Sequence, residues 1–299
     1  MTQYKKSNKP YSGGITTTLP LWRGVTLVLC VFVLTLIVGG VCAGIARGWF
    51  PENSRDGFLA SSVTQNIVTF FGAALLSSFF LSHKPFYFLG LRTGTRPMTL
   101  FNIVVCFALG LPFLNEIVWL NSQMHFPDAF AGIENWMRSL EDTAGKQVDV
   151  LLGVKSVGGL LVNILIVGVL TGFCEEIFFR GTLQRCLYAS GAGKHVAIWA
   201  AAFIFSLLHF QFFGFVPRLL LGAFFGYLFV WTGSIYACAF AHALFNSITV
   251  VTVWLMNRGV KADIVEDFGV QESGFPWIAC ISLALLLVYI IVLKRNRRF

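Results

Sequence analysis

The sequence predicts an all-α, polytopic membrane protein: a helix bundle of about eight spans, with an amphipathic surface helix between the third and fourth. Apolar residues make up 56% of the 299 residues and charged residues only 12%, with a mean hydropathy of +0.74. This leaves too little polar surface to solvate a water-soluble domain. Several apolar runs also reach the roughly 20 residues that a helix needs to cross the hydrocarbon core, and they lack the alternation of barrel strands.

The apolar runs divide into eight expected spans within one membrane domain that covers residues 1–299. They lie at 24–46, 63–82, 100–121, 158–180, 196–213, 217–232, 234–256 and 275–293. The fifth and sixth are short because Pro217 and Arg218 interrupt a nearly continuous apolar stretch. We expect these two segments to be tilted, half-buried or re-entrant.

The distribution of basic residues predicts the orientation. If the N-terminal segment 1–23 is cytoplasmic, every strongly basic segment falls on the same side of the membrane. These residues are Lys5, Lys6, Lys9 and Arg23, then Lys84, Arg92 and Arg96, then Arg185 and Lys194, and in the tail 294–299 Lys294, Arg295, Arg297 and Arg298. The opposite loops are mixed or acidic, so the positive-inside rule favours eight spans with both termini cytoplasmic.

Residues 122–156 form the one sizeable polar insertion. Its core, IENWMRSLEDTAGKQVDVLL, places Trp136, Met137 and Leu140 at helical intervals, which predicts an amphipathic helix on the membrane surface. Two roles are compatible with this pattern: a packing cover over the bundle, or a lid that guides substrate.

Ionisable side chains inside the spans are the first candidates for function, because they are costly in a bilayer. Glu176 and Arg180 are four residues apart at the end of the fourth span and share a helix face, so we expect an ion pair. Glu175 points about 100° away around the helix. A carboxylate in such a low-dielectric position suits general-base work on water, although the three residues could also form an inert polar knot.

Two further spans each carry polar residues of the same kind. His209 follows Phe205 by four residues, and taken alone it is typical of a hydrogen-bonded packing histidine. His242 and Asn246 are also four apart and share a face of the seventh span. Two neighbouring donors suit an oxyanion hole, and they equally suit an interhelical hydrogen-bond clasp.

Three short patterns occur in order on separate spans, within the expected core at 158–256. EEIFFR fits EExxxR, FSLLH fits FxxxH, and HALFN fits HxxxN. The chain therefore resembles the CAAX protease and bacteriocin-processing family, also called the Abi family, whose eukaryotic relatives are the Ras-converting CAAX prenyl endopeptidases. The motif-bearing match covers about residues 160–253, and the first 150 residues add only a compatible set of spans.

The resemblance implies the roles of the motif residues. Glu175 and His209 would hold and activate the attacking water. His242 and Asn246 would stabilise the tetrahedral oxyanion. The other two residues of the first motif, Glu176 and Arg180, would support the site.

The same scheme needs no cofactor or metal. Zinc bound by Glu175, His209 and His242 is the less favoured alternative, because the chain has no HExxH helix and no other short-range ligand spacing of known zinc sites. Glu116 belongs to no motif, and it could be an interfacial residue, a satisfied core acid or a residue at the rim of the cavity.

The function that the resemblance implies is that of an intramembrane endopeptidase, which we expect in the cytoplasmic membrane of a bacterium. Its partners would be the lipid bilayer and a membrane-associated or lipidated peptide or protein, with no nucleic acid. A non-proteolytic immunity or scaffold protein of the same fold is the alternative. A proton-coupled transporter is less favoured, because the chain shows no inverted repeat.

One conflict remains in this scheme. Glu175 and His209 both fall late in successive spans that run in opposite directions, which separates them across the membrane. For the two side chains to meet, the fifth span must be shifted or broken.

Overall fold

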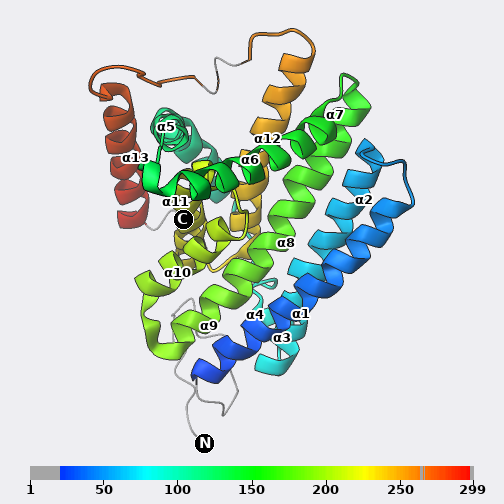
Figure 1. The fold of residues 1–299 in the computed structure, drawn as a ribbon. Helices are drawn as coiled ribbons and strands as arrows, with labels where there is room; N and C mark the ends of the chain where they lie inside the picture. The colour runs from blue at the N-terminus through cyan, green and yellow to red at the C-terminus, as the bar shows by residue number, and fades with distance from the viewer. Residues whose placement is uncertain (1–20, 263–264, 266, 297–299) are drawn as a thin grey trace, which may run out of the picture.

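The structure, a computed structural model, describes residues 21–262, 265 and 267–296. Within these residues it is a bundle of helices without strands, and seven helices are long and apolar enough to cross a membrane (Figure 1). The predicted all-α, polytopic fold is confirmed. Residues 1–20 of the N-terminal segment and 297–299 of the basic tail lie outside the described part of the chain.

The helices follow one another with few extended connections. The first half contains α1 (Leu21–Gly48), α2 (Arg55–Gln65), η1 (Asn66–Phe71), α3 (Gly72–Leu81), α4 (Pro85–Phe88), α5 (Pro97–Ser122), η2 (Asp128–Phe130) and α6 (Ala131–Leu152). The second half contains α7 (Val157–Asn163), η3 (Ile164–Leu170), α8 (Thr171–Phe178), η4 (Phe179–Gln184), α9 (Arg185–Leu187), η5 (Tyr188–Ala192), α10 (Lys194–Leu207), η6 (Phe212–Gly214), α11 (Phe215–Thr232), α12 (Ile235–Asn257) and α13 (Trp277–Arg295). Four of the η elements are π-helical turns inside longer helices, so α2 to α3 and α7 to η5 each form one rod.

The outer helices expose apolar side chains, as lipid contact requires. On α1, Leu34 and Ile37 are 59% and 61% exposed, and on α13 Val288 is 60% exposed. The core between the helices is aromatic: Phe32 of α1 stacks on Phe178 of α8, with 4.4 Å between ring centroids. An apolar exterior around a packed interior is the arrangement expected of a bundle that has lipid as its solvent.

The fourth predicted span was too short. We predicted that it ends at residue 180 and leaves Arg185 in a cytoplasmic loop, but the rod continues to Ala192. Arg185 is buried, and its Nη1 donates to the carbonyl oxygen of Tyr87 while its guanidinium faces the rings of Phe88 and Phe229. These contacts compensate the desolvation of the charge, so the helix tolerates an arginine that hydropathy alone assigns to a loop.

The fifth predicted span, at 196–213, was too long. The helix there, α10, ends at Leu207 and has only 14 residues, which gives a rise of about 21 Å against a hydrocarbon core of about 30 Å. A turn at residues 208–214 then leads into α11, which runs back through the bundle. The predicted break in this span is confirmed, and it stops His209 inside the bundle instead of carrying it across.

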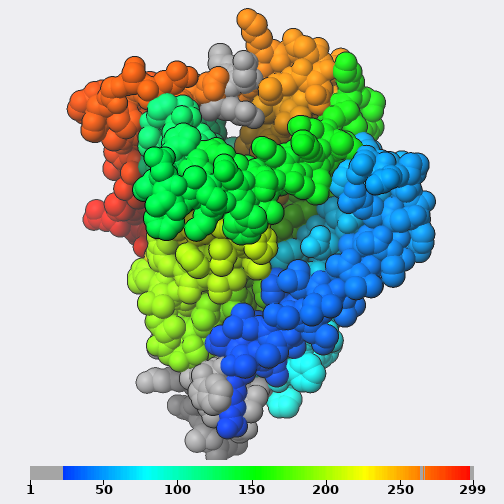
Figure 2. Space-filling model, in the orientation of Figure 1, coloured from blue at the N-terminus to red at the C-terminus, as the bar shows by residue number. Residues whose placement is uncertain are grey.

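The α6 helix fills the predicted position between the third and fourth spans. It lies across one face of the bundle, over the ends of α10 and α11 (Figures 1 and 2). Trp136 contacts the ring of Phe212, Arg138 lies 4.2 Å from the ring centroid of Phe213, and Glu141 accepts a hydrogen bond from the Phe213 amide. The helix therefore covers the turn that follows α10.

Glu116 is a satisfied core acid. It is 2% exposed on α5, and its Oε2 accepts a hydrogen bond from the amide of Gln271 at 2.8 Å. Asn115 beside it donates to the carbonyl oxygens of Val265 and Phe268. The two residues hold the connection between α12 and α13, so the structure gives Glu116 a structural role.

Glu134 secures the start of α6. Its carboxylate accepts hydrogen bonds from the Phe126 amide, from Arg138 and from His125. The backbone amide of Phe126 is the largest cause, followed by Arg138, and together they lower the pKa of Glu134 from 4.5 to about 2. The negative charge of this carboxylate is therefore favoured by the folded chain.

This pKa predicts a pH-dependent contribution to stability. Because the folded pKa is depressed, the contribution is complete above pH 4.5 and is lost as the pH falls toward about 2. We expect the difference in thermal unfolding midpoint between the wild type and Glu134→Gln, measured in detergent, to be largest above pH 4.5 and to shrink toward zero near pH 2. A difference that is constant across this range would contradict the assignment.

Candidate active site

Small residues bring the rod of α7 to η5 against α12. A Cβ added to Gly168 would meet Ser247 Oγ at 2.6 Å, and one added to Gly172 would meet the Ala243 amide nitrogen at 3.0 Å. Two glycines four residues apart thus allow the two helices to approach closely, as small-xxx-small pairs do in membranes. This contact sets Glu175 and Glu176, which follow Gly172 on the rod, beside His242 on α12.

A second pair of glycines, Gly222 and Gly226 on α11, accepts hydrogen bonds from side chains of the rod. Arg180 Nη2 donates to the carbonyl oxygen of Gly222 at 2.8 Å, and one turn later Gln184 Nε2 donates to that of Gly226 at 3.1 Å. A side chain on Gly226 would collide with Gln184 Oε1 and Ile198. Arg180 lies on the π-helical turn η4, the kind of helix irregularity that often marks a functional site.

The predicted pair of Glu176 and Arg180 is present and fully buried. Arg180 Nη1 donates to Glu176 Oε1 at 2.6 Å, and both side chains are at most 1% exposed. The guanidinium also lies between 4.9 and 5.7 Å from the ring centroids of Phe179, Phe205 and Phe225. A buried charge is tolerated only with such compensation, so the pair and its cage must form together.

Glu176 also orients His242. The same Oε1 that binds Arg180 accepts a hydrogen bond from His242 Nδ1 at 2.9 Å. The carboxylate therefore fixes the proton on Nδ1 and aims Nε2 at the neighbouring carboxylate. His242 Nε2 lies 3.9 Å from Glu175 Oε2, which is buried and makes no hydrogen bond among the described residues.

His209 lies at the turn after α10, one aromatic ring away from His242. The Phe205 ring contacts both imidazoles, at centroid distances of 4.9 Å to His209 and 5.7 Å to His242. His209 Nδ1 donates to the Phe205 carbonyl oxygen at 2.8 Å, which leaves Nε2 as the acceptor. Within the described chain no hydrogen bond or ion pair joins His209 to Glu175, so the structure does not bring these two predicted partners into direct contact.

Asn246 lies one turn beyond His242 on α12, as predicted. Its Nδ2 donates to the carbonyl oxygen of Val167 at 3.0 Å. This bond is the interhelical clasp that the sequence left open as an alternative to an oxyanion donor. Since an amide carries two N–H groups, the clasp occupies one and leaves the other.

Residues 157–248 match the family model described as "Type II CAAX prenyl endopeptidase Rce1-like". The family resemblance is confirmed. The Rce1-like segment begins at α7, ends within α12 and contains all three motifs, and together with the seven candidate spans it makes the chain an integral multi-pass membrane protein.

A curated relative matches part of the same chain. It is the protein YpbD of Bacillus subtilis (strain 168), described as uncharacterized, which is 28% identical over 90 residues. The match covers 29% of this chain and 43% of YpbD, so the chain spans less than half of that relative's length. No solved structure matches.

Arg218 is a residue of the Rce1-like segment whose place in the site the sequence did not predict. It starts the second turn of α11, and its guanidinium donates to the carbonyl oxygen and to Oε1 of Gln211, which closes the turn after His209. It lies within electrostatic range of Glu175 and of Glu141 on α6. Arg218 is therefore a second guanidinium group, besides Arg180, close to the carboxylates of Glu175 and Glu176. The sequence feature that could have revealed this role is an arginine within an apolar run. We interpreted that arginine only as a break between two spans.

The turn around Arg218 is shaped to hold it. A Cβ on Gly214 would lie 2.8 Å from Arg218 Nη2, so the guanidinium occupies the space of a missing side chain. Phe210, next to His209, has a φ of +52°, a left-handed conformation that is costly for an aromatic residue. The position of His209 is therefore determined by the turn as a whole.

The residues proposed for zinc in the alternative scheme do not fit a metal ion. Among the described residues, no three His, Cys, Asp or Glu side chains are grouped to hold one. His242 Nδ1 is already bound to Glu176, and the Phe205 ring packs against both His209 and His242.

Removing Arg180 should be strongly destabilising. Arg180→Met leaves Glu176 charged and buried, which costs about 3–5 kcal/mol of unfolding free energy. The double variant Glu176→Gln with Arg180→Met should cost less than the sum of the two single changes. Equilibrium unfolding in mixed micelles measures both, with the exposed Arg92→Met as a control that should stay within about 0.5 kcal/mol. Additive single effects would contradict a coupled pair.

Proposed function

We propose that the chain is an intramembrane endopeptidase that hydrolyses a peptide bond with a water activated by Glu175 and His209. The observation that carries this proposal is the buried Glu175 carboxylate, whose Oε2 accepts no hydrogen bond among the described residues and lies 3.9 Å from His242 Nε2, with that histidine held in one orientation by a second, arginine-bound carboxylate. A buried carboxylate that accepts no hydrogen bond suits a general base. The match to a family described as an endopeptidase supports the same reaction class.

The proposed reaction begins with proton transfer from water to Glu175. The resulting hydroxide adds to the carbonyl carbon of the scissile peptide, and the carbonyl oxygen becomes the oxyanion of a tetrahedral intermediate. His209 Nε2, an acceptor because Nδ1 donates to Phe205, helps to orient the water. Collapse of the intermediate breaks the C–N bond, and the proton held by Glu175 passes to the leaving amine nitrogen.

His242 and Asn246 would act on the oxyanion. With Nδ1–H bound to Glu176, the ring of His242 is held so that its Nε2–H, when the ring carries both protons, can donate to the oxyanion. The Asn246 amide has one N–H outside its bond to Val167. Glu176 and Arg180 act as positioning residues, because they hold His242 and α11 without facing the reacting atoms.

The substrate proposed is a membrane-associated or lipidated peptide or protein that reaches the site from the bilayer. The matched family is described as a CAAX prenyl endopeptidase, so a prenylated peptide is the first substrate to test. The proposed location is the cytoplasmic membrane of a bacterium, with both termini cytoplasmic. Neither nucleic acid nor a resident cofactor is needed for this reaction.

The first test is cleavage of lipidated and membrane-embedded peptides by purified protein. Loss of the base in Glu175→Gln should lower the rate by roughly 10²–10⁴-fold, and His209→Gln and His242→Gln should also lower it strongly. Glu116→Gln is the matched control, since Glu116 is equally buried but bound to Gln271 outside the site. Cleavage that survives all three site variants would sink the proteolytic assignment in favour of a scaffold or transporter.

A second test concerns Arg218 as a positioning residue for His209. Arg218→Met leaves the Gln211 carbonyl without its donor and should lower kcat by roughly tenfold, the effect of about 1.4 kcal/mol, with a smaller change in KM. Gly214→Ala, which pushes a methyl group against the guanidinium, should reduce kcat in the same direction without removing the charge. Unchanged kcat in both variants would show that the turn does not position His209.

A further inference from the structure

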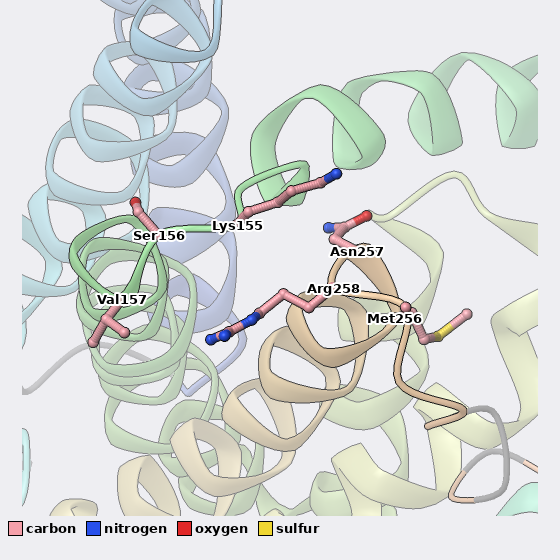
Figure 3. A pocket seen from close by; sticks show the side chains of 7 residues that line it. Lys155, Ser156, Val157, Met256, Asn257 and Arg258 are labelled. Atoms are coloured by element: carbon pink, nitrogen blue, oxygen red, sulfur yellow. The ribbon is translucent and has the colours of Figure 1, made fainter.

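A groove opens far from the candidate active site, at the end of the bundle where α7 begins and α12 ends. Its volume is about 850 Å³, and it is lined by Lys155, Ser156, Val157, Met256, Asn257, Arg258 and Gly259. Figure 3 shows the Lys155 side chain directed toward Asn257 and the Arg258 side chain directed toward Val157. The two cationic side chains thus reach across the groove from opposite walls.

The groove is strongly cationic. None of its lining residues is acidic, and within the described part of the chain neither Lys155 nor Arg258 forms an ion pair. Asn257 and Ser156 add neutral polar groups to the same walls. Figure 3 shows the charged ends of Lys155 and Arg258 on opposite sides of the groove, so an anion in the space between them meets a positive charge on each side.

The walls of the groove are fixed to one another. Trp254 Nε1 donates to the carbonyl oxygen of Lys155, and Asn257 Nδ2 donates to that of Leu152. The Arg258 guanidinium lies 4.6 Å from the centroid of the Trp254 ring, which holds the arginine stem against α12. The Arg258 guanidinium and the backbone of Lys155 are therefore held in place, which reduces the entropy lost when an anion binds.

The depth of the groove selects the kind of anion. The groove lies beside the first residue of the candidate span Val157–Ala192 and the last residue of the candidate span Ile235–Asn257. The end of a transmembrane helix is the level of the lipid headgroups, and a tryptophan there is typical of the interface. At this level the abundant anion is the phosphodiester of a phospholipid, and basic pockets between transmembrane helices bind such headgroups.

We propose that this groove binds the headgroup phosphate of a membrane phospholipid between Lys155 and Arg258, with preference for lipids of net negative charge. A zwitterionic lipid carries a cation beside its phosphate, which the two basic side chains repel, whereas phosphatidylglycerol does not. The site is separate from Glu175 and from the proposed hydrolysis. It would anchor the start of the rod from α7 to η5 and the end of α12, and these two helices carry Glu176 and His242.

Lipid binding to the full chain in detergent micelles tests this proposal. Short-chain phosphatidylglycerol is titrated and bound lipid is counted by native mass spectrometry, with phosphatidylcholine and inorganic phosphate as separate arms. At about 1 kcal/mol for each basic side chain, Lys155→Gln with Arg258→Gln should weaken phosphatidylglycerol binding roughly thirtyfold, and each single change roughly fivefold. The charge-preserving pair Lys155→Arg with Arg258→Lys should stay close to the wild type.

Lys261→Gln provides the matched control. Lys261 is exposed three residues beyond Arg258 but does not line the groove. The proposal is supported if phosphatidylglycerol binds more tightly than phosphatidylcholine and only the groove variants lose it. It is overturned if the double variant binds like the wild type, if Lys261→Gln weakens binding as much, or if inorganic phosphate displaces the lipid at equal concentration. Unfolding midpoints of each variant without added lipid exclude loss of fold as the cause.

Discussion

The rest of the site depends on one guanidinium group buried in a lipid-facing protein. Arg180 is out of reach of water, so its charge is tolerable only because Glu176, the Gly222 carbonyl and three aromatic rings surround it. Two of these partners also make contacts that build the rest of the site. Glu176 orients His242, and Gly222 belongs to α11, whose following turn admits Gln184. The charge thereby holds three helices in one register, and the remaining carboxylate, Glu175, keeps its Oε2 without a hydrogen bond among the described residues.

Glycine makes that register possible, because the polar groups can meet only if the backbones approach. The pairs Gly168 with Gly172 and Gly222 with Gly226 each lie four residues apart and face another helix, where an added Cβ would collide at Gly168 and Gly226 and would be tightly packed at Gly172 and Gly222. In a bilayer, helices gain little from burying apolar surface against one another, and close packing together with hydrogen bonds holds them. The glycines therefore determine the active-site geometry as much as the ionisable residues do.

Sequence spacing correctly predicted which side chains share a face of one helix. It did not predict features that depend on contacts between two helices. The faces shared by Glu176 with Arg180 and by His242 with Asn246 follow from a four-residue spacing, and the structure shows both. Three other features do not follow from such spacing: the end of α10, the burial of Arg185 and the position of Arg218. They depend on contacts between helices, such as the hydrogen bond from Arg185 to the distant Tyr87. The close helix contacts at the glycine pairs could have been predicted, because glycines four residues apart are a known signal for close helix packing.

The turn after α10 explains why the insertion at α6 belongs to the bundle. Irregular backbone at membrane depth is stable only where protein groups satisfy it. Here Asn121 bonds both the Phe212 carbonyl and the Val216 amide, Arg218 bonds the Gln211 carbonyl, and Glu141 of α6 accepts from the Phe213 amide. Lifting α6 would leave the Phe213 amide without its acceptor beside the strained Phe210. A broken helix that holds His209 inside the bundle therefore needs its cover, so any opening of α6 to substrate must also disturb the turn that positions His209.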